Sequence, residues 1–141
     1  MLANLTSPFV AHHGTSGRFQ TFSEDFIRHF GFHVGTREQA SHFGRRCLSV
    51  LVRISNPLPL PDLGTWDYQS VIREARKAGV DITEGEYDQV FNHTDETKAT
   101  RRLLEAKGFD GIVYYNAVEG GGYSYIAFRP DQLTILPKQC G

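Results

Sequence analysis

A pair of strand-like runs that enclose a glycine-rich loop constrains the fold of this chain more than any other feature. The segment spans residues 108–128 and reads GFDGIVYYNAVEGGGYSYIAF. Its flanks, 111–115 and 123–128, are rich in β-branched and aromatic residues, which favour a pleated, half-buried surface. The three glycines that end the loop cannot continue a strand at low entropic cost. Because a simple hairpin needs only two loop residues, this longer loop with Asn116 and Glu119 indicates a functional loop, or else a flexible hairpin whose Glu119 is solvated.

The two faces of the second run differ in composition. In a regular strand, Ser124, Ile126 and Phe128 share one face, and the alternate residues, Tyr123 and Tyr125 among them, share the other. We expect one of these faces to be core.

The length and composition of the chain indicate one domain over residues 1–141. A globular chain of 141 residues buries about 68–70% of the surface that its unfolded form exposes, so folding needs neither a disulfide nor a metal. Cys47 and Cys140 are far apart and imply no disulfide framework, which fits a reducing, cytoplasmic compartment best. The N-terminus lacks a signal-peptide pattern and no long apolar run is present, so we expect neither a signal peptide nor a membrane span. We also expect a monomer.

The charge is nearly balanced but unevenly distributed. Residues 1–53 hold six Arg and three acidic residues, a surplus of +3, whereas residues 54–141 hold nine Lys or Arg and thirteen acidic residues, a deficit of −4. A nucleic-acid-binding protein carries a stronger basic surplus. The basic front of the chain still suits a small anion such as a pyrophosphate. Arg18, Arg45 and Arg46 are candidates for it, although solvated surface positions are the simpler interpretation.

The order of the predicted elements indicates an α+β fold. Short strand-like runs come first, prolines then force an extended connector, and helices with capping and stop signals follow. We expect strands over 9–15, 31–36 and 48–54, a helix from the capping box of Thr36 and Gln39 to about Gly44, helices over 65–78, 83–91 and 94–107, and a last strand over 132–136 that Pro137 ends. Strands therefore cluster at both ends of the chain with three or four helices between them, which predicts a split, mostly antiparallel sheet.

Two histidines occur in similar contexts. His13 precedes Gly14 at the end of one strand-like run, and His33 lies in another run just before a glycine. His12 and His13 point to opposite faces of a regular strand, and we favour His13 because it adjoins the glycine. A single histidine near a strand end is more often structural than catalytic, but two in parallel contexts favour a site.

A metal site is the weaker interpretation of these histidines. It would need a third ligand beside His13 and His33, for example Asp110 or Glu119, and an open position. Since the sequence shows no metal-ligand spacing, we expect no metal. Asp110 is equally suited to stabilising a turn.

The succession of short motifs resembles that of ADP-ribosyltransferase domains of the diphtheria-toxin and poly-ADP-ribose-polymerase type. It is most similar to the small versions found in polymorphic toxins and in the polyvalent proteins of phages. The motifs that carry the resemblance are, in chain order, His13-Gly14-Thr15, GFHVGT at 31–36, GFDGI at 108–112, the loop and strand at 116–128, and RPDQL at 129–133. Together they span almost the whole chain.

The resemblance implies NAD as a substrate, transfer of ADP-ribose to a macromolecular acceptor, protein rather than nucleic acid, and no metal. In that family the histidine of the first motif bonds a ribose hydroxyl and the glycine backbone bonds the nicotinamide amide, and these roles fall on His13 and Gly14. His33 stands where the second motif usually supplies a tyrosine that stacks on nicotinamide. The implied binding set is completed by Thr15, Phe32, Gly35, Thr36, Asn116, Ser124 and Tyr125.

The third family element is a glutamate, and at its usual place stands Ser124. The resemblance therefore leaves Glu119 of the preceding loop as the catalytic carboxylate beside His13 and His33, or a domain that has lost or altered its activity. Cleaving the nicotinamide–ribose bond leaves positive charge on the sugar, as in glycoside cleavage. A nearby carboxylate stabilises that charge more in the transition state than in the ground state, which accelerates the step.

Three other functions remain compatible with these residues. NAD hydrolysis would use the same site with water as the acceptor. A non-catalytic module that binds NAD or ADP-ribose is favoured by Ser124 in place of glutamate. An RNA 2′-phosphotransferase is supported by the two histidines, but no pair of phosphate-binding arginines is evident and the chain is slightly acidic.

Overall fold

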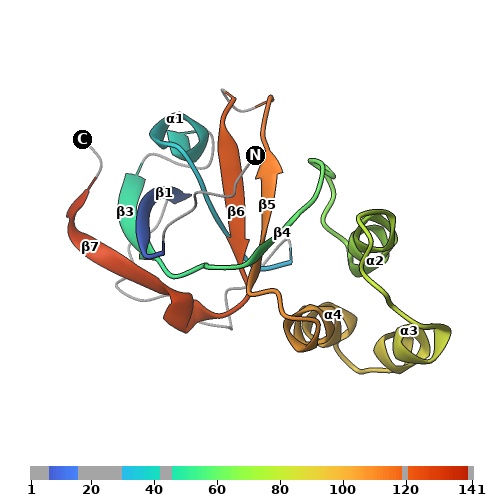
Figure 1. Ribbon diagram of the computed structural model, residues 1–141. Helices are drawn as coiled ribbons and strands as arrows, with labels where there is room; N and C mark the ends of the chain where they lie inside the picture. The colour runs from blue at the N-terminus through green and yellow to red at the C-terminus, as the bar shows by residue number, and fades with distance from the viewer. Residues whose placement is uncertain (1–6, 16–29, 42–45, 119–120, 140–141) are drawn as a thin grey trace.

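The computed structural model describes residues 7–15, 30–41, 46–118 and 121–139, and these residues form an α+β fold (Figure 1). The elements are β1 (Phe9–Thr15), β2 (Phe32–Val34), α1 (Arg37–Ala40), β3 (Arg46–Val52), β4 (Pro57–Pro59), α2 (Tyr68–Lys77), α3 (Glu84–Phe91), α4 (Glu96–Ala106), β5 (Gly111–Tyr115), β6 (Tyr123–Ala127), the short turn η3 (Pro130–Gln132) and β7 (Leu133–Gln139). The predicted α+β class is confirmed.

The described strands form two sheets. One has the order β1-β3-β7 and the other the order β2-β6-β5-β4. Their pairs are antiparallel except for β4 with β5, which is parallel. The sheets meet at an isolated antiparallel bridge between His12 and Gly35, whose backbone hydrogen bonds measure 2.8 and 2.9 Å. This arrangement is the split, mostly antiparallel sheet that the sequence predicts.

Both faces of the four-stranded sheet contribute side chains to apolar clusters. Ile112, Ile126 and Phe128 pack into one apolar cluster with residues of α2, α3 and α4. Phe32 and Ala127 pack into a second cluster with the three-stranded sheet. The face of β6 that carries Ser124 and Ile126 is core, as expected, and helices cover it (Figure 1). On the other face, toward the second sheet, Ala127 is also buried, whereas Tyr123 is 40% exposed.

The helices begin where the capping signals predict. Thr36 caps α1 and Thr83 caps α3, each with a complete capping box. Asp67, two residues after the expected start, caps α2, and Asp95 caps α4. Each cap accepts a backbone N–H that the first helical turn would otherwise leave unpaired. The end predicted for the first helix, near Gly44, lies outside the described residues.

The last strand differs from the prediction. β7 continues through Pro137 to Gln139, whereas Pro137 was expected to end it. β7 is an edge strand of its sheet, where a missing backbone N–H need not break a ladder. Its register against β3 also shifts between Leu48 and Val50, and this irregularity accommodates the proline.

Cys47 is disulfide-bonded, whereas sequence spacing implied no disulfide framework. Spacing along the chain misses this bond because it does not reveal which segments lie beside β3 in the fold. Cys140 itself lies outside the described residues. No helix in the described part of the chain combines the length and the apolar character needed to cross a bilayer.

Candidate functional site

The two histidine motifs meet where the sheets join. His13 Nδ1 lies 2.7 Å from the backbone oxygen of His33. A carbonyl oxygen only accepts, so Nδ1 must carry the proton, and in the neutral ring Nε2 then has the lone pair. Burial lowers the pKa of His13 below its usual 6.5, and the hydrogen bond to His33 opposes this shift more weakly. His13 is therefore a neutral ring of fixed tautomer at pH 7.

His33 lies in an aromatic surrounding. Its Nδ1 is 3.0 Å from the hydroxyl of Tyr114, and its ring meets those of Tyr114 and Trp66 edge-on, with centroids 6.0 Å away in both cases. Trp66 and Tyr114 pack against each other at 4.7 Å, and both are buried. These contacts hold the imidazole in one orientation.

A buried polar network connects α1 to the β5–β6 hairpin. The Ser124 hydroxyl donates to Gln39 Oε1 at 2.6 Å, and Asn116 Nδ2 donates to Ser124 Oγ at 3.4 Å. All three side chains are nearly inaccessible to solvent. A serine hydroxyl has one proton to donate, and Ser124 donates it to Gln39. The prediction that Asn116 and Ser124 contact NAD stays a prediction.

The same glutamine holds the base of the hairpin loop. Gln39 Nε2 donates to the carbonyl oxygens of Gly121 and Gly122 at 2.7 and 3.0 Å. The backbone N–H of Asn116 donates to the carbonyl of Gly122 at 2.9 Å, which closes the loop at its ends. Glu119 lies between these anchors and outside the described residues. The backbone at both ends of this loop is therefore fixed by hydrogen bonds.

Gly35 makes the network possible. A Cβ at Gly35 would overlap Gln39 Oε1 and come within 3.0 Å of Ser124 Oγ. The glycine is therefore required for close packing against the side chains of Gln39 and Ser124. Thr36, next in the chain, caps α1 and accepts from the N–H of Gln39 at 3.1 Å.

Strand register divides the predicted binding residues between two faces. His33 is opposite Ile126 and Tyr114 is opposite Ser124, so these side chains share the helix-covered face of the four-stranded sheet. Phe32 and Tyr125 lie on the other face, toward the three-stranded sheet, where Tyr125 meets Phe9 with ring centroids 4.9 Å apart.

His13 approaches the four-stranded sheet from the opposite direction. It shares a face of β1 with the core residue Ala11 and reaches the backbone of His33. Gly14 is buried in β1 next to it, and Thr15 ends that strand. The first motif therefore meets the second at the edge of β2.

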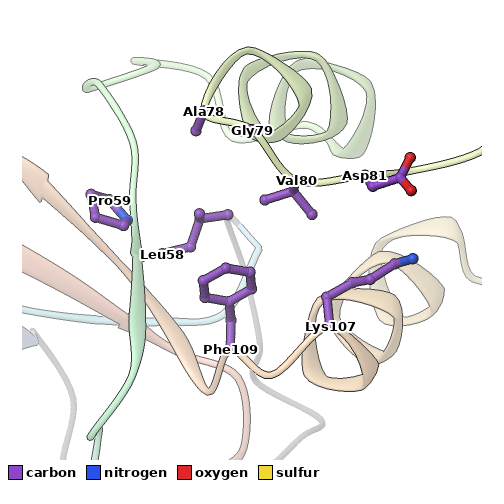
Figure 2. Close-up of a pocket in the computed structure, with 8 residues that line it drawn as sticks. All are labelled: Leu58, Pro59, Ala78, Gly79, Val80, Asp81, Lys107 and Phe109. Carbon is purple, nitrogen blue, oxygen red and sulfur yellow. The ribbon is translucent and has the colours of Figure 1, made fainter.

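The pocket drawn in Figure 2 lies elsewhere. It has a volume of about 600 Å³ and is formed by β4 and the segments after α2 and α4. Its lining consists of Leu58, Pro59, Ala78, Gly79, Val80, Asp81, Lys107 and Phe109. None of the predicted site residues contributes to it.

Asp110 has a structural role. Its carboxylate accepts the backbone N–H groups of Ser55 and Asn56, both at 2.8 Å. It thereby fixes the turn before β5 to the end of the β3–β4 connection. The described residues also contain no group of three His, Cys, Asp or Glu side chains that could hold a metal ion.

Sequence reasoning missed three residues of this region. Gln39 was visible only as a helix cap, and Trp66 and Tyr114 carried no motif. Trp66 lies in a loop before α2, far from the histidines in sequence, and the single tryptophan of the chain was the one available signal.

Comparison with known proteins identifies the family. A family model described as ADP-ribosyltransferase in polyvalent proteins matches residues 6–136. A solved structure described as the crystal structure of an anti-CRISPR protein is 13% identical, covers 98% of this chain and 100% of its own, and has a TM-score of 0.47. No curated protein matches the chain. With nearly its whole length matched by the family model, the chain belongs to the family of ADP-ribosyltransferase domains of polyvalent proteins.

Proposed function

We propose that this domain binds NAD, cleaves the bond between nicotinamide and ribose, and transfers ADP-ribose to a macromolecular acceptor. The family supports ADP-ribosyl transfer in general. The single observation that carries the finer proposal is the 2.7 Å hydrogen bond between His13 Nδ1 and the His33 carbonyl. It joins the two motifs that would hold the nicotinamide end of NAD.

His13 would bind the nicotinamide ribose. Its Nδ1 proton is fixed on a carbonyl, so Nε2 has the lone pair that can accept a ribose hydroxyl proton. Its pKa is lowered by burial, which keeps the ring neutral and preserves this acceptor. The backbone of Gly14 would bond the nicotinamide amide, as in the family, with Thr15 completing the motif.

His33 would orient the nicotinamide side of the site. The Tyr114 hydroxyl and the Trp66 ring hold its imidazole, so it is preorganised rather than ordered on binding. Phe32, Gly35, Thr36 and Tyr125 complete the proposed binding set around β2 and β6. Fixed side chains of this kind contribute to catalysis by positioning.

Glu119 would supply the negative charge for the oxocarbenium-like transition state. Support for this role comes from the described residues around it. Asn116 and Gly122 are hydrogen-bonded to each other, and Gln39 donates to Gly121 and Gly122. Hydrogen-bonded loop ends of this kind support electrostatic preorganisation of the site.

A macromolecular acceptor, and a protein in particular, is supported by exposed side chains next to this loop. Tyr115 and Tyr123 form an edge-on pair with centroids 5.5 Å apart, and they are 54% and 40% exposed. Val118 within the loop is 83% exposed. Exposed aromatic and aliphatic side chains are typical of protein-binding surfaces. We propose a phage or toxin effector that acts on a protein in the cytoplasm.

A non-catalytic module that binds NAD or ADP-ribose is the second candidate. The observation that favours it is the burial of Ser124, with its proton donated to Gln39, at the place where the family has glutamate. A hydroxyl held in this way supplies no negative charge to a developing cation.

Nicotinamide release from NAD tests the proposal. We expect release by the wild type and a loss of about 10²–10³ in rate in both His13→Ala and Glu119→Gln. His12→Ala is the matched control, because His12 is the next residue but points to the other face of β1. Binding of NAD without release would support the module, and release that needs no acceptor would indicate hydrolysis. Unchanged release in both variants would refute the site.

A further inference from the structure

Arg46 begins β3 on the same face as His13. Register places Arg46 opposite Thr15 and Leu48 opposite His13 in the β1–β3 ladder. Directly opposite residues point to the same face of a sheet. Leu48 belongs to the core cluster between the two sheets, so this face is turned toward the four-stranded sheet. Arg46 therefore lies two residues, roughly 7 Å, beyond the level of His13 on that face.

The guanidinium of Arg46 has an unsatisfied donor. Its Nε is buried and has no hydrogen-bond partner among the described residues. The salt bridges found within the described ranges do not include Arg46 either. By contrast, Arg76 and Arg129 donate to protein oxygens. Buried donors are nearly always paired in native proteins, so this one points to a ligand.

A second buried side-chain atom without a hydrogen-bond partner among the described residues lies away from Arg46. It is Nδ1 of His12, which lies on the opposite face of β1 from His13. The unsatisfied donor beside the first motif is therefore that of Arg46.

We propose that Arg46 binds the pyrophosphate of NAD. Guanidinium is a planar donor that pairs with phosphate through two parallel hydrogen bonds, and it stays charged at every physiological pH. The pyrophosphate is attached through the 5′ carbon of the ribose that His13 would bind, so a phosphate contact belongs about one sugar away from His13. The position of Arg46 satisfies this requirement. This inference rests on the proposed function for the identity of the ligand.

Arg46 is one of the three arginines that the sequence offers for a pyrophosphate. Arg18 and Arg45 lie outside the described residues, whereas Arg46 has a defined strand position next to the first motif. The surplus of +3 over residues 1–53 includes this side chain and favours an anionic ligand there.

Binding of three ligands to Arg46→Gln tests the inference. NAD and ADP-ribose contain the pyrophosphate, and nicotinamide riboside lacks it. We expect Arg46→Gln to lower the affinity for NAD and for ADP-ribose about 10- to 100-fold, as for a lost charge-assisted hydrogen bond. The affinity for nicotinamide riboside should not change. The matched control is Arg53→Gln, which removes the same charge from an exposed side chain just after β3. Equal weakening of all three ligands, or of none, would overturn the inference.

Further measurements separate this inference from the proposed function and from misfolding. If the wild type binds ADP-ribose through Arg46 but releases no nicotinamide, the pyrophosphate site stands and the transferase proposal fails. If nicotinamide is released and Arg46→Gln binds NAD as tightly as the wild type, the pyrophosphate site alone fails. If Arg46→Gln does not fold, Arg46→Lys keeps the charge but loses the bidentate geometry. The affinity of Arg46→Lys for NAD should fall several-fold, and its affinity for nicotinamide riboside should not change. An affinity for NAD equal to that of the wild type would contradict the inference.

Discussion

Tyr114 of β5 places its hydroxyl 3.0 Å from Nδ1 of His33 in β2, across the strand that separates them. The two residues are 81 positions apart in the chain. Tyr114 lies directly opposite Ser124, which in turn bonds Gln39. The second histidine motif and the start of α1 are thus each hydrogen-bonded to the β5–β6 hairpin.

We expect Tyr114→Phe to impair NAD turnover more than protein stability. The change removes only the hydroxyl beside His33 and keeps the buried ring, so the free energy of unfolding should fall by about 1 kcal/mol. Loss of the fixed orientation of His33 should lower kcat/KM for nicotinamide release about 10-fold. Tyr115→Phe is the control, since Tyr115 is the next residue and is exposed. Equal effects of the two changes would contradict a role for the hydroxyl in orienting His33.

Acidification should destabilise the fold through His13. Its pKa is lowered in the folded state by burial, from a usual value of 6.5. Below pH 6.5 the unfolded chain therefore binds more protons than the folded one. The free energy of unfolding should fall as pH drops from 6.5 toward the folded pKa, and this contribution should be constant above 6.5.

Urea unfolding at about pH 7.5 and about pH 5.5 measures this effect. His13→Gln should show a smaller loss of stability on acidification than the wild type. The pKa of His12 is also lowered, by burial and by Arg37, so part of the loss should remain in that variant. An equal loss in the wild type and the variant would show that His13 does not contribute.

Replacing Ser124 with the family residue should not create a better enzyme. In Ser124→Glu, a carboxylate would meet Gln39 Oε1, which now accepts the serine proton at 2.6 Å, in a buried position. Burying a charge without a partner is strongly unfavourable, and we expect a loss of about 3–5 kcal/mol in the free energy of unfolding. Ser124→Ala should cost about 1 kcal/mol, because Gln39 Oε1 loses one of its two donors and keeps the backbone N–H of Thr36. A gain in nicotinamide release by Ser124→Glu would show that this position serves as the catalytic one.

Gly35→Ala should disrupt the link between α1 and the hairpin. The added Cβ would overlap Gln39 Oε1, and overpacking of this kind typically costs about 1–3 kcal/mol. Gly85→Ala is the matched control. Its added Cβ lies within α3 and meets Thr83 Oγ1 at 3.9 Å, so we expect a change between zero and a gain of about 1 kcal/mol. Thermal unfolding of the two variants compares them directly, and equal melting temperatures would argue against the packing role of Gly35.

Much of the local structure followed from sequence pattern. β1, β5 and β6 begin and end close to the predicted positions, and the capping boxes at Thr36 and Thr83 are present. Such features depend on neighbours within a few residues, so propensity and capping chemistry suffice to predict them. The same reasoning failed at Pro137, because whether a proline ends a strand depends on whether that strand lies at an edge.

The sequence by itself determined the residue types, the order of the elements and the succession of motifs from His13 to Ser124, because each depends on chemistry close along the chain. Only the tertiary structure decided which of them meet: that His13 bonds the backbone of His33, that Gln39 bonds Ser124, and that Arg46 shares a face with His13. These pairs depend on strand register and on the bridge between the two sheets. A shift of one residue in either would turn every side chain to the other face, and no local pattern specifies that register.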